Sequence, residues 1–463
     1  MNTRILTYFL LWVLTALISC KSTPKNTPTY FGGKIINPKS NYVLLYSMEK
    51  VIDTLFLDSN NKFLGKFDKV NEGLYYFVHG LESQYIYLEP RDSLMLRLNT
   101  WDFDESLVFA GKGAERNNIL IDCFLEDEKE QKYFYKYNKL QPKDFKFKID
   151  SFTKQKLTTY NTYINKYPKE TFGFKNILKV ALTYSIYARA ESYPLEYAVA
   201  TKSFEFPKID GSFYSFRSNV SINKDSLMYY FPYVAYIRSY LYNVTYALGY
   251  KPMVNEFSSD FTVDLLKTIN NKVTSKNSRN AFLKQTTITH FYRKSSCNVN
   301  ENAFDTFFEL SSNKDDKKQI KRLLSDAKAI QKGQKINDFS IINFNNNKQS
   351  IKGILKNKKT LLFFWNPRYV SKAYIASRIS YLTSKYPTIQ FVQIKINGNS
   401  TDRIKSLDIK NQYFIDTISS ANAFLTSKMP RTILVNKKGI ITNGYASLSS
   451  RNIYAQLESL AKN

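Results

Sequence analysis

Length, composition and charge describe a folded chain of several domains. The 463 residues are 43% hydrophobic and 16% aromatic, which excludes a disordered chain and allows two or three separate cores. The formal net charge of +28 would attract anionic partners, but no block of five or more basic residues stands out. Because no nucleic-acid-binding motif accompanies this charge, we expect no nucleic-acid partner.

The first twenty residues have the pattern of an export signal. Arg4 precedes the largely apolar segment 5–18, which is too short for a comfortable membrane span and fits a signal peptide. The Leu-Ile-Ser-Cys sequence that ends at Cys20 resembles a bacterial lipobox. The resemblance implies that residues 1–19 are removed and that Cys20 becomes an acylated, palmitate-bearing first residue, with residues 20–29 as a lipidated tether. An ordinary secretory signal with an incidental cysteine is the alternative.

A lipid anchor would set the compartment of the protein. It would attach the chain to a membrane of the cell envelope, and Lys21 provides no inner-membrane retention signal of the Asp type, so the resemblance implies the outer membrane. In an oxidising compartment Cys123 and Cys297 could form one structural disulfide. Two separately buried thiols are the alternative, because sequence alone cannot establish a contact between them.

Residues 30–113 predict a β-sandwich. Short runs of aromatic and β-branched residues alternate with turn signals, which is typical of an antiparallel sandwich. The predicted strands are 41–46, 51–56, 74–78, 85–88 and 93–98.

Residues 114–332 predict a mostly α-helical region. Long tyrosine-rich stretches lack β-turn punctuation, and prolines such as Pro194 are expected near helix ends or in loops. The acidic, mixed-sign residues 126–130 predict a solvated helix face. An aromatic stripe at residues 229–237 predicts core packing, with the lining of a groove as the alternative. The predicted helices are 145–167, 174–193, 228–250, 261–273 and 279–291.

Residues 333–463 predict an α/β domain. Strands alternate with helices, which implies a central sheet covered on both faces. The apolar run 360–364 is typical of a buried central strand. The predicted strands are 339–344, 360–365, 389–396, 432–435 and 440–445, and the predicted helices are 373–386, 420–427 and 452–462.

This C-terminal segment resembles the TlpA-like and peroxiredoxin-like domains of the thioredoxin fold. The resemblance is carried by the entry at residues 333–339, the Trp-Asn-Pro-Arg-Tyr-Val-Ser-Lys sequence at 365–372, and the Lys-Met-Pro-Arg sequence at 428–431. Residues 85–99 and the exit at 109–118 resemble the small β-domain that precedes such domains in bacterial envelope lipoproteins. The resemblance implies a multidomain lipoprotein with a β-sandwich, a helical region and a thioredoxin-like α/β domain.

The same resemblance implies a redox site that has lost both cysteines. In the family, a thiolate at a helix N-terminus attacks a disulfide and a second cysteine resolves the intermediate. Here Tyr369 and Lys372 follow Trp365 at those two positions, and no cysteine lies between residues 333 and 463. Pro430 matches the cis-proline of the family, before which Met429 would present backbone groups to an extended peptide.

Two functional hypotheses follow. The first is a non-catalytic envelope lipoprotein that binds a protein, peptide or glycan partner. The second is a thiol–disulfide oxidoreductase or antioxidant protein that uses Cys123 or Cys297. We favour the first because a phenol with an ordinary pKa of about 10 cannot replace a thiolate. The sequence has two histidines and no clustered His/Cys ligands or glycine-rich nucleotide motif, so we name no catalytic residue and expect no metal or cofactor.

Overall fold

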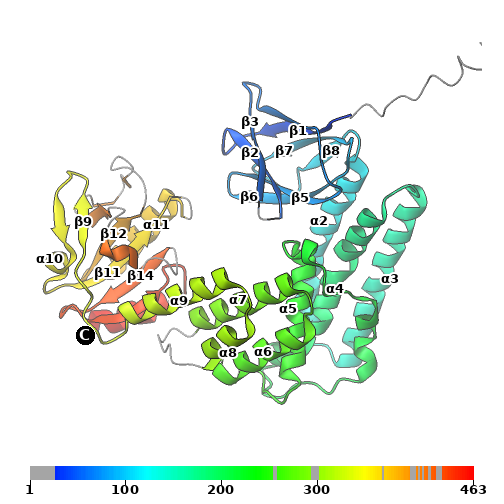
Figure 1. The fold of residues 1–463 in the computed structure, drawn as a ribbon. Coiled ribbons are helices and arrows are strands. Elements are labelled where there is room, and N and C mark those ends of the chain that lie inside the picture. The colour runs from blue at the N-terminus through cyan, green and yellow to red at the C-terminus, as the bar shows by residue number, and fades with distance from the viewer. Residues whose placement is uncertain are drawn as a thin grey trace, which may run out of the picture. The chain divides into compact units, whose positions relative to one another are not determined.

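The protein is described from a computed structural model that covers residues 27–48, 50–253, 258–293, 302–367, 370–396, 403–404, 407–408, 411–415, 419–423 and 430–462. The predicted signal peptide, Cys20 and most of the predicted tether lie outside these residues. The chain divides into two compact units, one up to Asn243 and one from Val244 onward. Figure 1 shows a β-rich N-terminal region, a helical middle region and a sheet-containing C-terminal region.

The first unit begins with two four-stranded sheets. Their strand orders are β4-β1-β7-β8 and β3-β2-β5-β6. Apolar side chains of both sheets, Phe31, Val43 and Phe77 among them, share one buried cluster, as a sandwich requires. The strands are β1 (Thr29–Ile36), β2 (Tyr42–Ser47), β3 (Lys50–Phe56), β4 (Lys62–Phe67), β5 (Gly73–His79), β6 (Glu82–Leu88), β7 (Ser93–Asn99) and β8 (Val108–Ala110).

The expectation of a purely antiparallel sandwich is wrong at one pairing. Strands β1 and β7 run parallel, from the pair Tyr30 and Ser93 to the pair Ile36 and Asn99. The sequence pattern did not reveal β1, because two glycines interrupt its apolar run. Gly33 is required there, since a Cβ would lie 2.1 Å from the carbonyl oxygen of Leu96 on β7.

Four α-helices and two short 3-10 helices follow the sandwich in the chain. Aromatic rings fill the core among them, and the rings of Phe145 and Tyr193 stack with centroids 4.0 Å apart. The helices are α2 (Ala114–Tyr137), α3 (Pro142–Lys166), α4 (Phe172–Thr201), η1 (Gly211–Asn219), η2 (Asp225–Leu227) and α5 (Phe231–Tyr246), whose last turn crosses into the second unit.

Pro194 was expected near a helix end and instead lies buried inside α4. A proline in a helix interior removes one backbone hydrogen bond and costs about 3 kcal/mol. The preceding residue offsets part of this cost, because Tyr193 is fully buried and its hydroxyl donates to the Leu140 carbonyl at 2.7 Å. Tertiary packing therefore allows the helix to continue beyond the proline.

The acidic segment of α2 is not the fully solvated face that its sequence predicted. Glu130 is 4% exposed and pairs with Lys156 of α3 at 2.6 Å and with Arg189 of α4 at 3.1 Å. Burial raises the pKa of the Glu130 carboxyl, and the Lys156 ammonium opposes that shift. The segment joins three helices through buried ion pairs.

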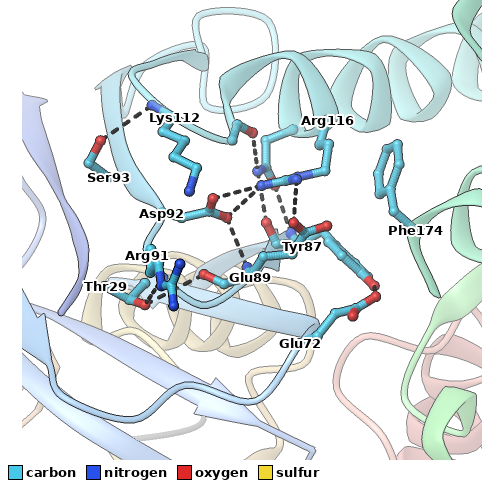
Figure 2. Close-up of polar contacts among 12 residues, drawn as sticks. Thr29, Glu72, Tyr87, Glu89, Arg91, Asp92, Ser93, Lys112, Arg116 and Phe174 are labelled. Carbon is cyan, nitrogen blue, oxygen red and sulfur yellow. Dashed lines mark hydrogen bonds and ion pairs between the residues drawn. The ribbon is translucent and has the colours of Figure 1, made fainter. Parts of the chain in front are cut away.

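One buried arginine joins the sandwich to the helices of the first unit, as Figure 2 shows. Arg116 of α2 contacts Asp92 at 2.6 Å, Glu89 at 2.8 Å and Glu170 at 3.4 Å. Asp92 lies just before β7 and is fully buried, while Glu170 lies between α3 and α4. Burial raises the pKa of both Asp92 and Glu89, and the Arg116 charge opposes the shift. A single guanidinium thus connects three segments that are far apart in sequence.

We expect Arg116→Met to lower the free energy of unfolding by about 3–5 kcal/mol, because it leaves the buried Asp92 carboxylate without its counter-charge. The matched control is Lys146→Met, which removes a partly exposed pair with Asp150 on α3 and should cost below about 1 kcal/mol. Urea unfolding midpoints of the two variants provide the measurement. Equal midpoints would contradict a structural role for the Arg116 contacts.

In the described residues of the second unit, four helices precede a seven-stranded sheet. The helices are α6 (Ser259–Lys272), α7 (Lys276–Arg293), α8 (Asn302–Leu310) and α9 (Lys314–Ala329). In spatial order the strands are β10 (Lys348–Ser350), β9 (Ser340–Asn343), β13 (Gln412–Phe414), β12 (Ile389–Lys395), β11 (Lys359–Trp365), β14 (Arg431–Val435) and β15 (Ile441–Ala446).

The central strands of this sheet have a mixed direction. Strands β11, β12 and β13 are parallel to one another, whereas β14 is antiparallel to β11 and to β15. Short helices complete the unit, namely α10 (Ile351–Leu355), α11 (Lys372–Lys385), the 3-10 helix η4 (Ser420–Ala423) and α12 (Ile453–Lys462). Of the helix predicted at 420–427, only this first part is described.

Both faces of the sheet are buried, as the sequence predicted. On one face Leu361 and Phe363 of β11 pack with Ile375 of α11 and Leu457 of α12. On the other face Leu362 and Phe364 join a second cluster with side chains of α10. The unbroken apolar run of β11 follows from this position between two cores.

Candidate peptide-binding site

The candidate site lies where β11 ends. Trp365, its last residue, is 2% exposed and packs in the same cluster as Ile375 of α11. Its carbonyl oxygen accepts a hydrogen bond from the Ile396 amide at 2.8 Å. Trp365 is therefore a core residue that fixes the end of the strand and is not placed to contact a ligand.

The turn from β11 into α11 closes locally. The Val370 amide donates to the Asn366 carbonyl at 3.2 Å, and the Ser371 hydroxyl caps the helix by accepting from the Tyr374 amide at 3.2 Å. Lys372 is the first helical residue and is exposed. Tyr369 lies outside the described residues. The helix N-terminus thus has a neutral serine cap two residues after the position at which the resemblance implies a thiolate.

Pro430 directly precedes β14 and is half-buried. The antiparallel register pairs Phe364 of β11 with Arg431 of β14. One residue further along each strand, Trp365 and Pro430 come to the same end of the sheet, next to the turn into α11. Met429, the other residue of the predicted shelf, lies outside the described residues.

A buried ion pair holds the strand that begins after Pro430. Arg431 and Asp326 of α9 are both fully buried, and the Arg431 Nη1 atom lies 2.9 Å from the Asp326 Oδ2 atom. The Arg431 Nε atom donates to the Gly444 carbonyl at 2.7 Å, and the guanidinium lies 3.9 Å from the centre of the Tyr445 ring. This pair was not predicted. Arg431 is visible as a charge at the start of an apolar strand, but nothing in the sequence points to Asp326, which is 105 residues earlier.

The cysteines do not supply a described reactive thiol. Cys123 lies on α2 of the first unit and is a free thiol with 5% exposure. Burial raises the pKa of this thiol to about 12, so it stays protonated at neutral pH. Cys297 lies outside the described residues. The sequence analysis left two alternatives for this cysteine, a disulfide or a separately buried thiol. Cys123 fits the second alternative.

We expect Cys123 to resist thiol reagents in the folded protein. The soluble chain from Lys21 to Asn463 with Cys297→Ser has Cys123 as its sole cysteine. At pH 8 the folded Cys297→Ser chain should release less than about a tenth of one equivalent of thionitrobenzoate from Ellman's reagent within an hour. The same chain unfolded in guanidinium chloride should release one full equivalent. Rapid reaction of the native variant would show that the thiol is accessible and would reopen a redox role.

In the described part of the chain, no group of three or more His, Cys, Asp or Glu side chains is arranged so that it could hold a metal ion. His79 accepts from the Lys39 amide at 2.9 Å, and His290 bonds the Thr262 hydroxyl at 2.8 Å. Both histidines are buried and have structural partners. Among the described helices, none is both long and apolar enough to cross a membrane.

Comparisons with known proteins give partial matches among solved structures. No protein-family model and no curated protein matches the chain. The thioredoxin domain of a thiol-disulfide oxidoreductase from Bacteroides vulgatus is similar at 19% identity, with 28% of this chain and 99% of that chain covered and a TM-score of 0.24. A thiol:disulfide interchange protein from a Bacteroides species is similar at 20% identity, with 29% and 93% covered and a TM-score of 0.24. Because these TM-scores are low, the interpretation of the fold rests on the strand order.

Proposed function

We propose that this chain is a lipid-anchored cell-envelope protein whose C-terminal domain is a thioredoxin-like scaffold for binding an extended peptide or protein segment. The proposal excludes thiol–disulfide chemistry in that domain. Its support comes from the sheet order, the ends of β11 and β14, and the identity of the residues at those ends.

The strand order supports a thioredoxin-like scaffold. A buried strand, β11, leads into a helix that packs on the sheet, and the two strands parallel to it, β12 and then β13, lie on one side. On its other side an antiparallel strand begins directly after Pro430. The helix N-terminus and the proline thus lie at the same end of the sheet, which supports the thioredoxin-like interpretation.

The observation that carries the non-redox part is the composition of this end of the sheet. Ser371 and Lys372 start α11, and no cysteine occurs between residues 333 and 463. The buried Cys123 thiol belongs to the other compact unit and is protonated at neutral pH. Disulfide exchange requires an accessible thiolate, and neither this end of the sheet nor Cys123 provides one. This supports peptide binding, the other role that the resemblance implies for the domain.

Peptide binding should be visible at Met429, the residue before Pro430. We label the methionine methyl groups of the soluble chain with ¹³C and add reduced, carboxymethylated α-lactalbumin, an unfolded polypeptide without thiols. The Met429 signal, assigned with Met429→Leu, should shift in a saturable way because an extended chain would bond the backbone beside Pro430.

Met253 belongs to the same compact unit and is 39% exposed, so its methyl signal is the internal control and should not move. A Met429 signal that stays unchanged at millimolar polypeptide would contradict the proposal.

The lipid anchor is tested separately at Cys20. We expect Cys20→Ala to move the protein from the membrane fraction to the soluble fraction and to remove the acyl mass from the N-terminal peptide, because the acyl chains would have no attachment site. Cys297→Ala is the control and should stay in the membrane fraction. An unchanged membrane fraction for Cys20→Ala would reject the lipoprotein interpretation.

A further inference from the structure

A cavity of about 360 Å³ opens in the first unit, between the sandwich and the helical region. The sandwich contributes the residues around β5, including Glu72 and Tyr75, and the helical side contributes Asn176 of α4 and Tyr229. This volume lies at the lower end of the range of about 300–1,000 Å³ that is usual for small-molecule sites. Tyr229 belongs to the aromatic stripe for which the sequence left the lining of a groove as an alternative.

The aromatic walls of the cavity are fixed by hydrogen bonds. The Tyr229 hydroxyl donates to the Leu74 carbonyl at 2.6 Å, and the Tyr75 hydroxyl donates to the Asn71 carbonyl at 2.9 Å. The Tyr229 ring also lies 6.2 Å from the Tyr76 ring. Tyr229 is half-buried, so part of this immobilised ring stays open to the cavity. A ring held in place before binding lowers the ordering cost of a ligand that stacks on it.

A glycine keeps one wall of the cavity in its shape. The Tyr87 hydroxyl donates to the Glu72 carboxylate at 2.6 Å, as Figure 2 shows, next to the first turn of α4. A Cβ on Gly173 would lie 2.2 Å from the Glu72 Oε1 atom and 2.5 Å from the Tyr87 hydroxyl oxygen. A Cβ at this position would therefore displace the Glu72 carboxylate and the Tyr87 hydroxyl from their present contact with the start of α4.

The lining has a mixture of polar groups without a net charge. It contains one acidic side chain, Glu72, and one basic side chain, Lys224, so their formal charges cancel. Besides the hydroxyls of three tyrosines, four neutral polar side chains that can both donate and accept hydrogen bonds line the cavity, Ser47, Asn71, Asn176 and Ser226. Such a set matches a ligand with many neutral hydroxyl or amide groups.

We propose that this cavity binds a neutral saccharide of one or two rings, with one sugar face against Tyr229 and its hydroxyl groups toward Asn176 and the neighbouring polar side chains. A pyranose has an apolar face and a rim of hydroxyls, which match the aromatic and polar parts of the lining. A free anion is disfavoured because the Glu72 carboxylate lines the same cavity as Lys224.

An extended peptide fits this cavity less well than a sugar. Strand β5 lies between β2 and β6 in its sheet, and β2 pairs with its residues 76–78. At the cavity end of β5 the Leu74 carbonyl already accepts a hydrogen bond from the Tyr229 hydroxyl, so a peptide strand would have to displace this contact. The cavity also belongs wholly to the first unit, so the saccharide site is independent of the proposed peptide-binding site in the second unit.

The test uses Met48, which lines the cavity and is half-exposed. Methyl spectra of the soluble ¹³C-methionine chain are recorded with cellobiose, maltose or N,N′-diacetylchitobiose, and with glucose 6-phosphate as the anionic comparison. At least one neutral disaccharide should shift the Met48 signal in a saturable way, while Met95 on β7, which does not line the cavity, stays in place.

Asn176→Leu should weaken the binding of that disaccharide at least about tenfold, since it removes a donor and an acceptor that a sugar would use. Lys179 is exposed on the same helix and does not line the cavity, so the control variant Lys179→Leu should bind the disaccharide as the native chain does. Ser226→Ala, at an exposed lining position, provides a second variant that should fold normally and should weaken binding by about two- to fivefold.

Each contrary result overturns the proposal. These results are a Met48 signal that no neutral sugar moves at 20 mM, a shift with glucose 6-phosphate alone, or unchanged affinity in both Asn176→Leu and Ser226→Ala. The Met95 signal of each variant shows that the sandwich is folded.

Discussion

The fully buried charge of Arg431 is the constraint on which the C-terminal sheet depends. A guanidinium removed from water costs several kcal/mol unless a carboxylate and hydrogen-bond acceptors replace its hydration. Asp326, the Gly444 carbonyl and the Tyr445 ring supply these partners. Because Arg431 directly follows Pro430, this requirement also fixes the place at which β14 begins. Helix α9, which precedes the sheet in the sequence, is thereby part of the scaffold that would present a peptide.

The first unit meets the same requirement with Arg116, and its ion pairs also affect the wall of the proposed saccharide cavity. Glu89, one partner of Arg116, accepts a hydrogen bond from the Thr171 hydroxyl at 3.2 Å. Thr171 in turn caps α4 by accepting from the Phe174 amide at 3.1 Å. Gly173 lies between these two residues of the helix start, so the ion pairs around Arg116 help to position the cavity wall. In each unit a buried arginine connects a sheet to helices that lie far away in sequence.

Much of the fold could be predicted because it follows from local periodicity. The alternation of short apolar strands revealed five sandwich strands, and the unbroken run at 360–364 revealed β11. The parallel pairing of β1 and β7 could not be predicted, since it depends on a non-local approach that Gly33 permits. Pro194 inside α4 escaped prediction for a similar reason, because packing of Tyr193 overrides the local preference of a proline.

For the candidate site, too, features set by local sequence could be predicted and features set by long-range contacts could not. The replacement of the two cysteines by Tyr369 and Lys372 could be recognised from the sequence, because the redox chemistry depends on residue type at a fixed spacing. The partnership of Arg431 with Asp326 and the convergence of Glu72 and Tyr87 on Gly173 depend on contacts across long separations. Such contacts leave no periodic signal in a single sequence. Charged residues at the ends of apolar runs, such as Arg431, are the sequence feature that indicates such long-range contacts.

Reduction of insulin by dithiothreitol is the measurement that tests the central claim most directly. The soluble chain from Lys21 to Asn463 is compared with its Tyr369→Cys/Lys372→Cys variant. The account predicts that the native chain does not raise the rate above the background, whereas the variant does, because the scaffold is retained and the thiols are restored. Activity of the native chain, or an inactive but folded double variant, would contradict the account.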